Sequence, residues 1–454
     1  MLNYQINKLN IAQIFFLLFL ASVFFPVRYV IPTSNSYILG FYSDFTAISL
    51  YLSDIFLFIT WCFCFLPRDI GYFWLRIKDY GLWILLLWLI LGLIWHYQTN
   101  NVVIWWYSLK YAEFIVAYGT SYYLFSKTDI KVLFFKLFAL FSSFEALLAV
   151  WQFITQKSLG LNKLGEQVLS QSIVGVSKVV SGGTSYIRGY GTFPHPNVLS
   201  AFLVAGGMIC LYLFMESKSL KARLFYGLTI IIHILGLTVS FSRAGYLSFV
   251  VGIAIYFGYY FVSSFKFSVK QFFSNKQITA AIIAISLGVI ISFVAFRPFL
   301  LTRATVTDDS SLQRIFYAKI AVKMMAKNPI FGLGIGESVI HMQQFTSLKL
   351  WPWQIQPIHN YFLLAGAELG IPGLLIFVWI FFSHFWGLIK KLKASHGLTT
   401  NYLLLTTILC IFLVLMQFDH YFYTLQQTQI LLWIILGTIG AELKNPSSEG
   451  LAKR

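Results

Sequence analysis

Residues 197–241 are NVLSAFLVAGGMICLYLFM, then ESKSLKAR, then LFYGLTIIIHILGLTVSF, two apolar runs on either side of a short basic segment. An apolar helix of about 17–25 residues is long enough to cross the hydrocarbon core of a bilayer. Both runs fall in this range. The stretch therefore predicts two membrane-spanning helices joined by a basic loop.

Similar apolar runs recur along the whole chain. They predict about twelve spans, near residues 11–31, 45–66, 80–96, 102–125, 132–155, 197–215, 224–241, 244–262, 278–296, 359–388, 402–418 and 425–442. The first run lacks a small-residue cleavage site, so it is kept as a helix and not as a signal peptide. Charged residues make up only 11% of the chain, against about 25% in soluble domains. We predict an all-α, polytopic integral membrane helix bundle, with residues 1–454 as a single membrane domain.

Basic residues mark one side of the membrane. Every second loop is basic, whereas the short loops between them carry almost no Lys or Arg. The basic loops contain Arg68, Arg76, Lys78; Lys127, Lys131, Lys136; Lys218, Lys221, Arg223; Lys266, Lys270, Lys276; and Lys390, Lys391, Lys393. Because basic loops stay in the cytoplasm, both termini are predicted to be cytoplasmic. Because basic residues are spread over loops between apolar spans, the net charge of +17 is a topology signal, so membrane lipids are expected partners and nucleic acid is not.

Two long loops, 156–196 and 297–358, fall on the opposite, extracytoplasmic side. Loops of this length are usually functional or disordered. In the second, Asp308 to Ser311 form an N-cap cluster before a helix over 312–325. Its apolar stripe is Ile315, Ala318, Val322 and Met325, and a second stripe is Lys319, Lys323 and Lys327. This pattern predicts an amphipathic helix on the outer membrane surface. A solvated helix packed on its neighbours is an equally good interpretation.

Three arginines on the outer side are candidates for binding a diphosphate. Arg243 lies in a very short loop at the membrane border, Arg314 opens the amphipathic helix, and Arg188 lies in the first long loop. An arginine at the border is costly unless it is paired, which makes it a functional candidate. The alternative is snorkelling to lipid headgroups. A guanidinium suits a diphosphate because it donates two parallel hydrogen bonds to phosphate oxygens.

Histidines at the outer boundary are candidates for proton transfer. His359 begins the span at 359–388, where an imidazole can accept a proton from a hydroxyl near neutral pH. A structural or interfacial histidine is the alternative. His195 lies between two prolines in a predicted rigid turn with Asn197 as the helix N-cap. Asp419 and His420 lie in the last outer loop and are weaker candidates for lining a cavity together with these histidines.

Neither a metal site nor a nucleotide site is predicted. The outer carboxylates are few and show no metal-ligand spacing, so arginines would have to neutralise a diphosphate. The run Gly332-Leu333-Gly334-Ile335-Gly336 follows no strand, so it is not a dinucleotide fingerprint. Asp54, Glu113 and Glu145 lie within spans, where they mark a transport path or form structural pairs. Glu113 follows Lys110 by three residues, which allows a pair on one helix face.

Four motifs in order resemble the O-antigen ligase and polymerase superfamily. They are Arg188 with GTFPHPN (191–197), SRAG (242–245), Arg314 with NPIFGLGIG (328–336), and HNYFLLAGAELGIPGL (359–374). Each motif is unspecific alone, but their order, spacing and common outer placement are more specific. The resemblance covers about residues 185–385 in motif detail and the whole chain in topology.

The resemblance implies a metal-independent membrane glycosyltransferase without a cofactor. Its donor would be an undecaprenyl-diphosphate-linked glycan, and its acceptor a lipid, a growing polysaccharide or a protein. In the motifs, Arg243 and Arg314 resemble diphosphate-binding arginines and His359 resembles the base. Arg188 is a further phosphate candidate, and the supporting candidates are His195, Asn360, Glu368, Asp419 and His420. The active side would be the extracytoplasmic side of the cytoplasmic (inner) membrane.

Other functions remain open at this point. The superfamily includes ligases, polymerases and protein-glycosylating enzymes, which the motifs do not separate. A secondary transporter would explain the spans and the intramembrane carboxylates, but it would favour an inverted repeat and broken helices. A non-catalytic flippase or scaffold would leave the outer basic residues without a role. The sequence does not name the sugar, its linkage, the acceptor or the oligomeric state.

Overall fold

The computed structural model describes residues 2–65, 79–99, 101–264, 266, 268–305, 309–394 and 400–444. Its long helices are α1 (Leu2–Phe24), α2 (Leu52–Phe65), α4 (Tyr80–Trp95), α5 (Val102–Lys127), α6 (Ile130–Thr155), α7 (Pro196–Glu216), α8 (Leu220–Ser240), α9 (Arg243–Tyr259), α11 (Lys276–Thr305), α12 (Asp309–Lys327), α14 (Tyr361–Ala394), α15 (Thr400–Phe418) and α17 (Gln426–Lys444). Short helices are α10 (Val269–Ser274), α13 (Ser338–His341) and α16 (Tyr421–Thr424). A helix therefore occupies each predicted span.

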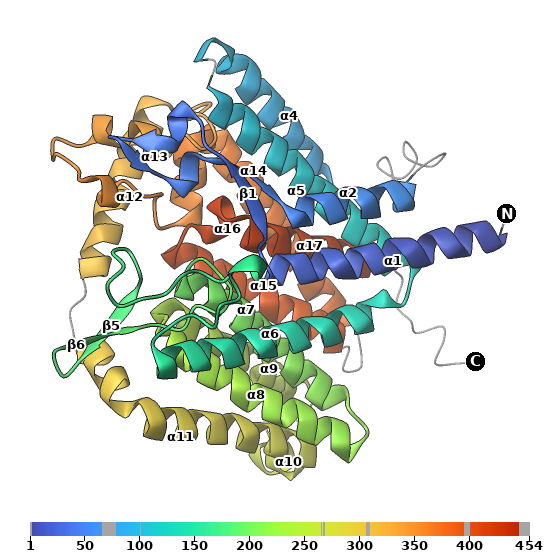
Figure 1. Ribbon diagram of the computed structural model, residues 1–454. Helices are drawn as coiled ribbons and strands as arrows, with labels where there is room; N and C mark the ends of the chain where they lie inside the picture. The colour runs from blue at the N-terminus through green and yellow to red at the C-terminus, as the bar shows by residue number, and fades with distance from the viewer. Residues whose placement is uncertain are drawn as a thin grey trace.

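The chain is an all-α, polytopic membrane protein. Seven helices in the described residues are long and apolar enough to cross a membrane: Ile130–Thr155, Pro196–Glu216, Leu220–Ser240, Arg243–Ser263, Lys276–Arg303, Tyr361–Ala394 and Asn401–Phe418. Helix α7 lies at the centre, buried along its length, and packs on α6, α8, α9 and α15. Its small residues allow this close approach, since a Cβ on Gly206 would lie 2.7 Å from the Nε2 atom of His233 on α8. The long connecting segments gather at one side of this bundle, at the left of Figure 1.

The first predicted span extends too far at its C-terminal end, and the second begins too early at its N-terminal end. Helix α1 stops at Phe24, two residues before Pro26, and the chain continues as β1 (Arg28–Ile31), which pairs antiparallel with β4 (Ile48–Tyr51). A smaller hairpin, β2 (Tyr37–Ile38) with β3 (Phe41–Tyr42), lies between them. Proline disfavours continuation of a helix, and the β-branched and aromatic residues that follow favour strands. Apolar content alone could not separate these strands from the spans.

The first long loop holds a further hairpin, and the second holds α12. Strands β5 (Lys178–Ser181) and β6 (Thr184–Ile187) pair antiparallel. Helix α11 extends to Thr305, beyond the predicted loop start at 297, and α12 follows from Asp309. Asp308, part of the predicted N-cap cluster, lies outside the described residues.

Helix α12 has two apolar faces. The inner face, with Tyr317, Ile320 and Met324, is buried, and the helix packs on α14. In the predicted outer stripe, Ile315 and Val322 are 55% and 56% exposed. The helix thus packs on its neighbours and also presents the apolar surface that an interfacial helix would place in lipid.

Helix α14 is broken near Gly370, where the backbone leaves the helical conformation (φ +75°, ψ 179°). The loop before α13 fits into the break: the Leu333 amide donates to the Ala367 carbonyl at 3.0 Å, and the Ile371 amide to that of Pro329 at 2.8 Å. A Cβ on Gly370 would collide with the Ile330 carbonyl. The glycine-rich run and the residues before it therefore supply hydrogen-bond partners at the break in α14. This packing accounts for its composition without a nucleotide.

Candidate active site

Residues from distant parts of the chain come together at the turn between α15 and α16. The Asp419 carboxylate accepts a hydrogen bond at 2.9 Å from the side-chain amide of Asn197, at the start of α7. The Asn197 amide oxygen accepts in turn from the Arg188 guanidinium, also at 2.9 Å. A positive group from the first long loop is thereby linked, through one amide, to a carboxylate near the C-terminal end of the chain.

Arg188 is held on several sides. Only 5% of the residue is exposed. Besides Asn197, its guanidinium donates to the carbonyl of Ser240 at 2.7 Å and to the hydroxyl of Ser177 at 2.8 Å. A buried arginine with all three side-chain nitrogens engaged fixes the surrounding backbone.

His359 precedes α14 and lies in an aromatic setting. Its Nδ1 atom is 2.8 Å from the Pro357 carbonyl oxygen, a contact that requires a proton on Nδ1. In the neutral ring the other nitrogen, Nε2, is then the proton acceptor. The Tyr317 ring stacks on the imidazole at 5.4 Å and 9°, and the His420 ring meets it edge-on at 5.0 Å. The ring is thus held in one orientation and one tautomer.

Burial and neighbouring charged groups set the protonation states of the side chains around His359. Burial would raise the pKa of Asp419, but the imidazoles of His420, His359 and His195 and the bond from Asn197 outweigh it and lower the pKa to about 2. Burial lowers the pKa of His420 to about 3, against the opposing effect of Asp419. Burial, aided by the charge of Arg188, lowers the pKa of His195 to about 3. At neutral pH, Asp419 is ionised, whereas His195 and His420 are uncharged.

The two remaining arginines reach this region from separate helices. Arg314 of α12 is partly buried, and its Nε donates to the Phe418 carbonyl, one residue before Asp419, at 3.1 Å. Arg243 begins α9, is exposed, and donates to the Arg303 carbonyl of α11 at 2.9 Å. The α8–α9 turn that carries Arg243 also supplies Ser240, the partner of Arg188. Arg314 therefore contacts the turn that carries Asp419, whereas Arg243 is linked to Arg188 only through the α8–α9 turn.

Three side chains in the site could hold a metal ion. Ligand atoms of His359, Asp419 and His420 lie within 4.8 Å of one another. The sequence prediction that no cluster has metal-ligand spacing overlooked this group, because His359 lies far along the chain from the other two. The Nδ1 atom of His420 is already engaged with the Thr424 hydroxyl at 2.7 Å. The cluster suits either a cation or a proton relay.

The other predicted residues have more structural surroundings. Asn360 caps α14 through Leu363 and donates to the Gln417 carbonyl at 3.0 Å, joining α14 to the end of α15. Glu368 accepts from the Gly336 amide at 2.7 Å and the Ser338 hydroxyl at 2.6 Å, so it holds the glycine-rich loop.

The predicted N-cap at Asn197 is wrong. His195 caps α7, its Nδ1 accepting from the Asn197 amide at 3.1 Å, because Pro196 takes the first helical position. Asn197 is therefore free of capping and bridges Arg188 and Asp419. Sequence reasoning also missed Tyr317 and Pro357, which orient His359; the predicted apolar periodicity of α12 gave no sign that Tyr317 faces a histidine.

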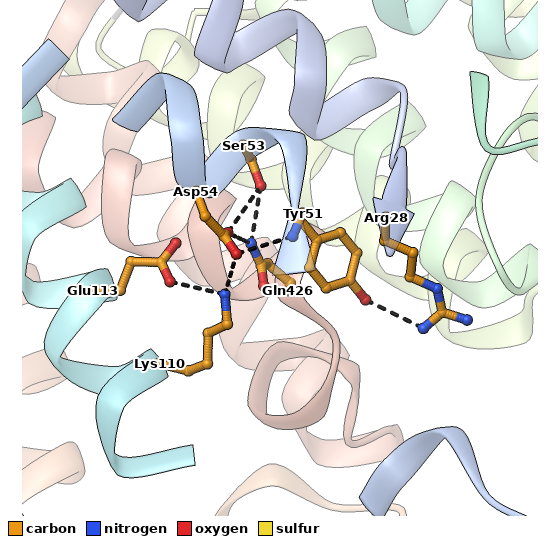
Figure 2. A network of polar contacts seen from close by, with 7 residues as sticks. All are labelled: Arg28, Tyr51, Ser53, Asp54, Lys110, Glu113 and Gln426. Atoms are coloured by element: carbon orange, nitrogen blue, oxygen red, sulfur yellow. Dashed lines mark hydrogen bonds and ion pairs between the residues drawn. The ribbon is translucent and has the colours of Figure 1, made fainter. Parts of the chain in front are cut away.

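The intramembrane carboxylates form structural contacts. Figure 2 shows Lys110 of α5 between the carboxylates of Asp54 and Glu113, with Gln426 of α17 also on Asp54. The predicted Lys110–Glu113 pair is confirmed, at 2.9 Å. Glu145 accepts from the amide and the hydroxyl of Thr192 at 2.7 and 3.0 Å. These partners join α2, α5 and α17, and fix the first long loop, so the contacts account for the carboxylates without a transport path.

One family model matches the chain. Residues 228–378 match the family described as O-antigen ligase, a segment that contains Arg243, Arg314 and His359 but not Arg188 or Asp419. No curated protein matches the chain. This match supports membership of the O-antigen ligase superfamily and a ligase- or polymerase-type membrane enzyme.

Proposed function

We propose that the chain transfers an undecaprenyl-diphosphate-linked glycan to an acceptor hydroxyl on a lipid, a growing polysaccharide or a protein. The observation that carries the proposal is the setting of His359. Its Nδ1 atom is held by the Pro357 carbonyl at 2.8 Å, which makes Nε2 the proton acceptor. Arg314 donates to the Phe418 carbonyl, two residues before His420, whose ring meets that of His359. A base beside a guanidinium is what transfer from a diphosphate requires.

The proposed reaction is a single displacement. The acceptor oxygen attacks the anomeric carbon while Nε2 of His359 takes the hydroxyl proton. The bond between that carbon and the diphosphate oxygen breaks, and undecaprenyl diphosphate leaves with the bonding electrons. The configuration at the anomeric carbon inverts.

Arg243 and Arg314 are assigned to the diphosphate. Each donates to a backbone carbonyl, and a guanidinium fork is suited to bond phosphate oxygens. Because they supply positive charge where negative charge develops, we propose that transfer needs no metal. Arg188, buried and bonded to Asn197, is assigned a positioning role. His195, Asp419 and His420 complete the surroundings of His359.

The proposed placement follows the sequence pattern. About twelve helices cross the cytoplasmic membrane, both termini are cytoplasmic, and the site opens to the extracytoplasmic side. The 1–454 chain acts as one membrane domain, with its catalytic core over about residues 185–385 and outer loops near 156–196 and 297–358.

The size distribution of carrier-linked glycan in cells lacking the gene tests the proposal. Finished polymer left on the carrier identifies a ligase, and single repeat units identify the alternative, a polymerase of the same superfamily. An unchanged carrier-linked pool contradicts both, and favours a secondary transporter.

A further inference from the structure

A cleft of about 180 Å³ lies between two segments that are distant in sequence, 38–45 with its β2–β3 hairpin and 352–356 before α14. This volume is several times the roughly 30 Å³ that one water occupies. Figure 1 shows the hairpin region on the same side of the bundle as α12 and α13. The walls come from segments that sequence analysis left without a function.

Exposed aromatic rings form the apolar part of the cleft. Trp353 is 64% exposed and Phe41 60% exposed. Trp351 stacks on Trp353 with ring centroids 5.1 Å apart and planes 8° from parallel, which holds the Trp353 ring in one orientation. A flat, exposed ring with a fixed orientation is a stacking platform for a molecule that has an apolar face.

Polar groups stand beside these rings and are themselves fixed. Both carboxylate oxygens of Asp44 accept from the Arg28 guanidinium, at 3.0 and 2.9 Å, and the Tyr42 hydroxyl donates to the same carboxylate at 2.8 Å. A carboxylate has about four acceptor positions, so these bonds leave room for a ligand hydroxyl. The side chain of Gln356 adds an amide at the opposite wall.

The cleft is joined to His359 by two sets of contacts. Phe45 lines the cleft, and its ring meets the His420 ring at 5.4 Å, which in turn meets His359. On the other wall, Tyr317 donates to the Gln354 carbonyl at 2.6 Å and stacks on His359. One ring, His420 on one side and Tyr317 on the other, therefore separates the cleft segments from the proposed base.

We propose that this cleft binds a saccharide unit and selects the sugar that reaches His359. A pyranose ring has a C–H face that stacks on an aromatic ring and hydroxyl edges that bond carboxylates and amides. The proposal rests on the proposed function, because that reaction brings a glycan to His359. The saccharide belongs either to the donor or to the acceptor glycan.

Binding to the full-length protein in lipid nanodiscs tests the proposal with two probes. One is the host's carrier-linked glycan released from its carrier by mild acid, which removes the diphosphate; the other is the finished surface glycan cleaved from its anchor. Trp353→Ala is expected to weaken binding about tenfold, and Trp353→Phe to restore most of it. Trp379→Ala, on the α14 surface and similarly exposed at 58%, is the matched control and should bind as the wild type does.

Each outcome decides the question. Binding of the carrier-released glycan assigns the cleft to the donor, and binding of the finished glycan alone assigns it to the acceptor. Equal affinity of Trp353→Ala and wild type, or no binding of either probe, overturns the proposal. If the wild-type gene still empties the carrier-linked pool in cells, only the saccharide cleft fails. If it does not, the proposed function fails as well.

Discussion

The side-chain amide of Asn197 donates to the carboxylate of Asp419 at 2.9 Å across 222 positions of the chain. Because Asn197 also accepts from Arg188, this single side chain connects a buried cation to the ionised carboxylate nearest His359. The relationship explains how the start of α7 and the α15–α16 turn keep a fixed geometry around the proposed base.

Asn197→Ala should lower the rate of transfer about tenfold, since it removes a hydrogen-bond partner from two buried residues, Arg188 and Asp419. Asn197→Asp, of the same size, should be worse because it places a second carboxylate against Asp419. The Michaelis constant for donor should change little in both. Rates measured on purified protein decide the point, and an Asn197→Asp enzyme as active as wild type would refute the positioning role.

His195 links stability to pH. Its folded-state pKa, lowered to about 3, lies below the unfolded value of about 6.5, so the unfolded chain binds a proton that the folded chain does not. Stability is therefore lost as pH falls below about 6.5, by up to about 2 kcal/mol at pH 5. His195→Asn keeps an N-cap acceptor and should show a smaller drop in Tm between pH 7.5 and 5. Equal drops in both proteins would show that His195 is not held uncharged.

Arg243→Lys and Arg314→Lys should each reduce kcat by about 10- to 100-fold, because lysine keeps the charge but loses the fork that bonds two phosphate oxygens. Arg223→Lys, in the first turn of α8 at the end predicted to be cytoplasmic, is the matched control and should leave kcat unchanged. Steady-state kinetics with carrier-linked glycan measure the effect. Unchanged kcat in both variants would show that neither arginine binds the diphosphate through its fork.

Chelation distinguishes two roles of the cluster formed by His359, Asp419 and His420, namely binding a metal ion and transferring a proton. If the cluster serves proton transfer, EDTA treatment should leave the rate of transfer unaltered, and added Zn²⁺ should inhibit by occupying the imidazoles. The measurement is the initial rate after dialysis against the chelator. Loss of activity on chelation with recovery on adding a divalent ion would make the cluster a metal site.

The sequence predicted the helices well and the site only in part. Long apolar runs mark helices such as α7 because burial and length leave few alternatives. The strand at Arg28–Ile31 was missed because apolar content looks alike in a strand and in a span end. His359, Arg243 and Arg314 lie within recognisable motifs. The Arg188–Asn197–Asp419 link and the cleft at Trp353 depend on contacts between distant segments, which no local pattern encodes.

The central claim is that His359 accepts the acceptor's proton. The most direct test is the carrier-linked glycan pool in cells whose only copy carries His359→Ala, with membrane level and Tm of the variant matched to wild type. General-base catalysis is worth about 10²–10⁴-fold, so the account predicts that glycan accumulates on the carrier as it does without the gene. A pool and product distribution equal to wild type would contradict it.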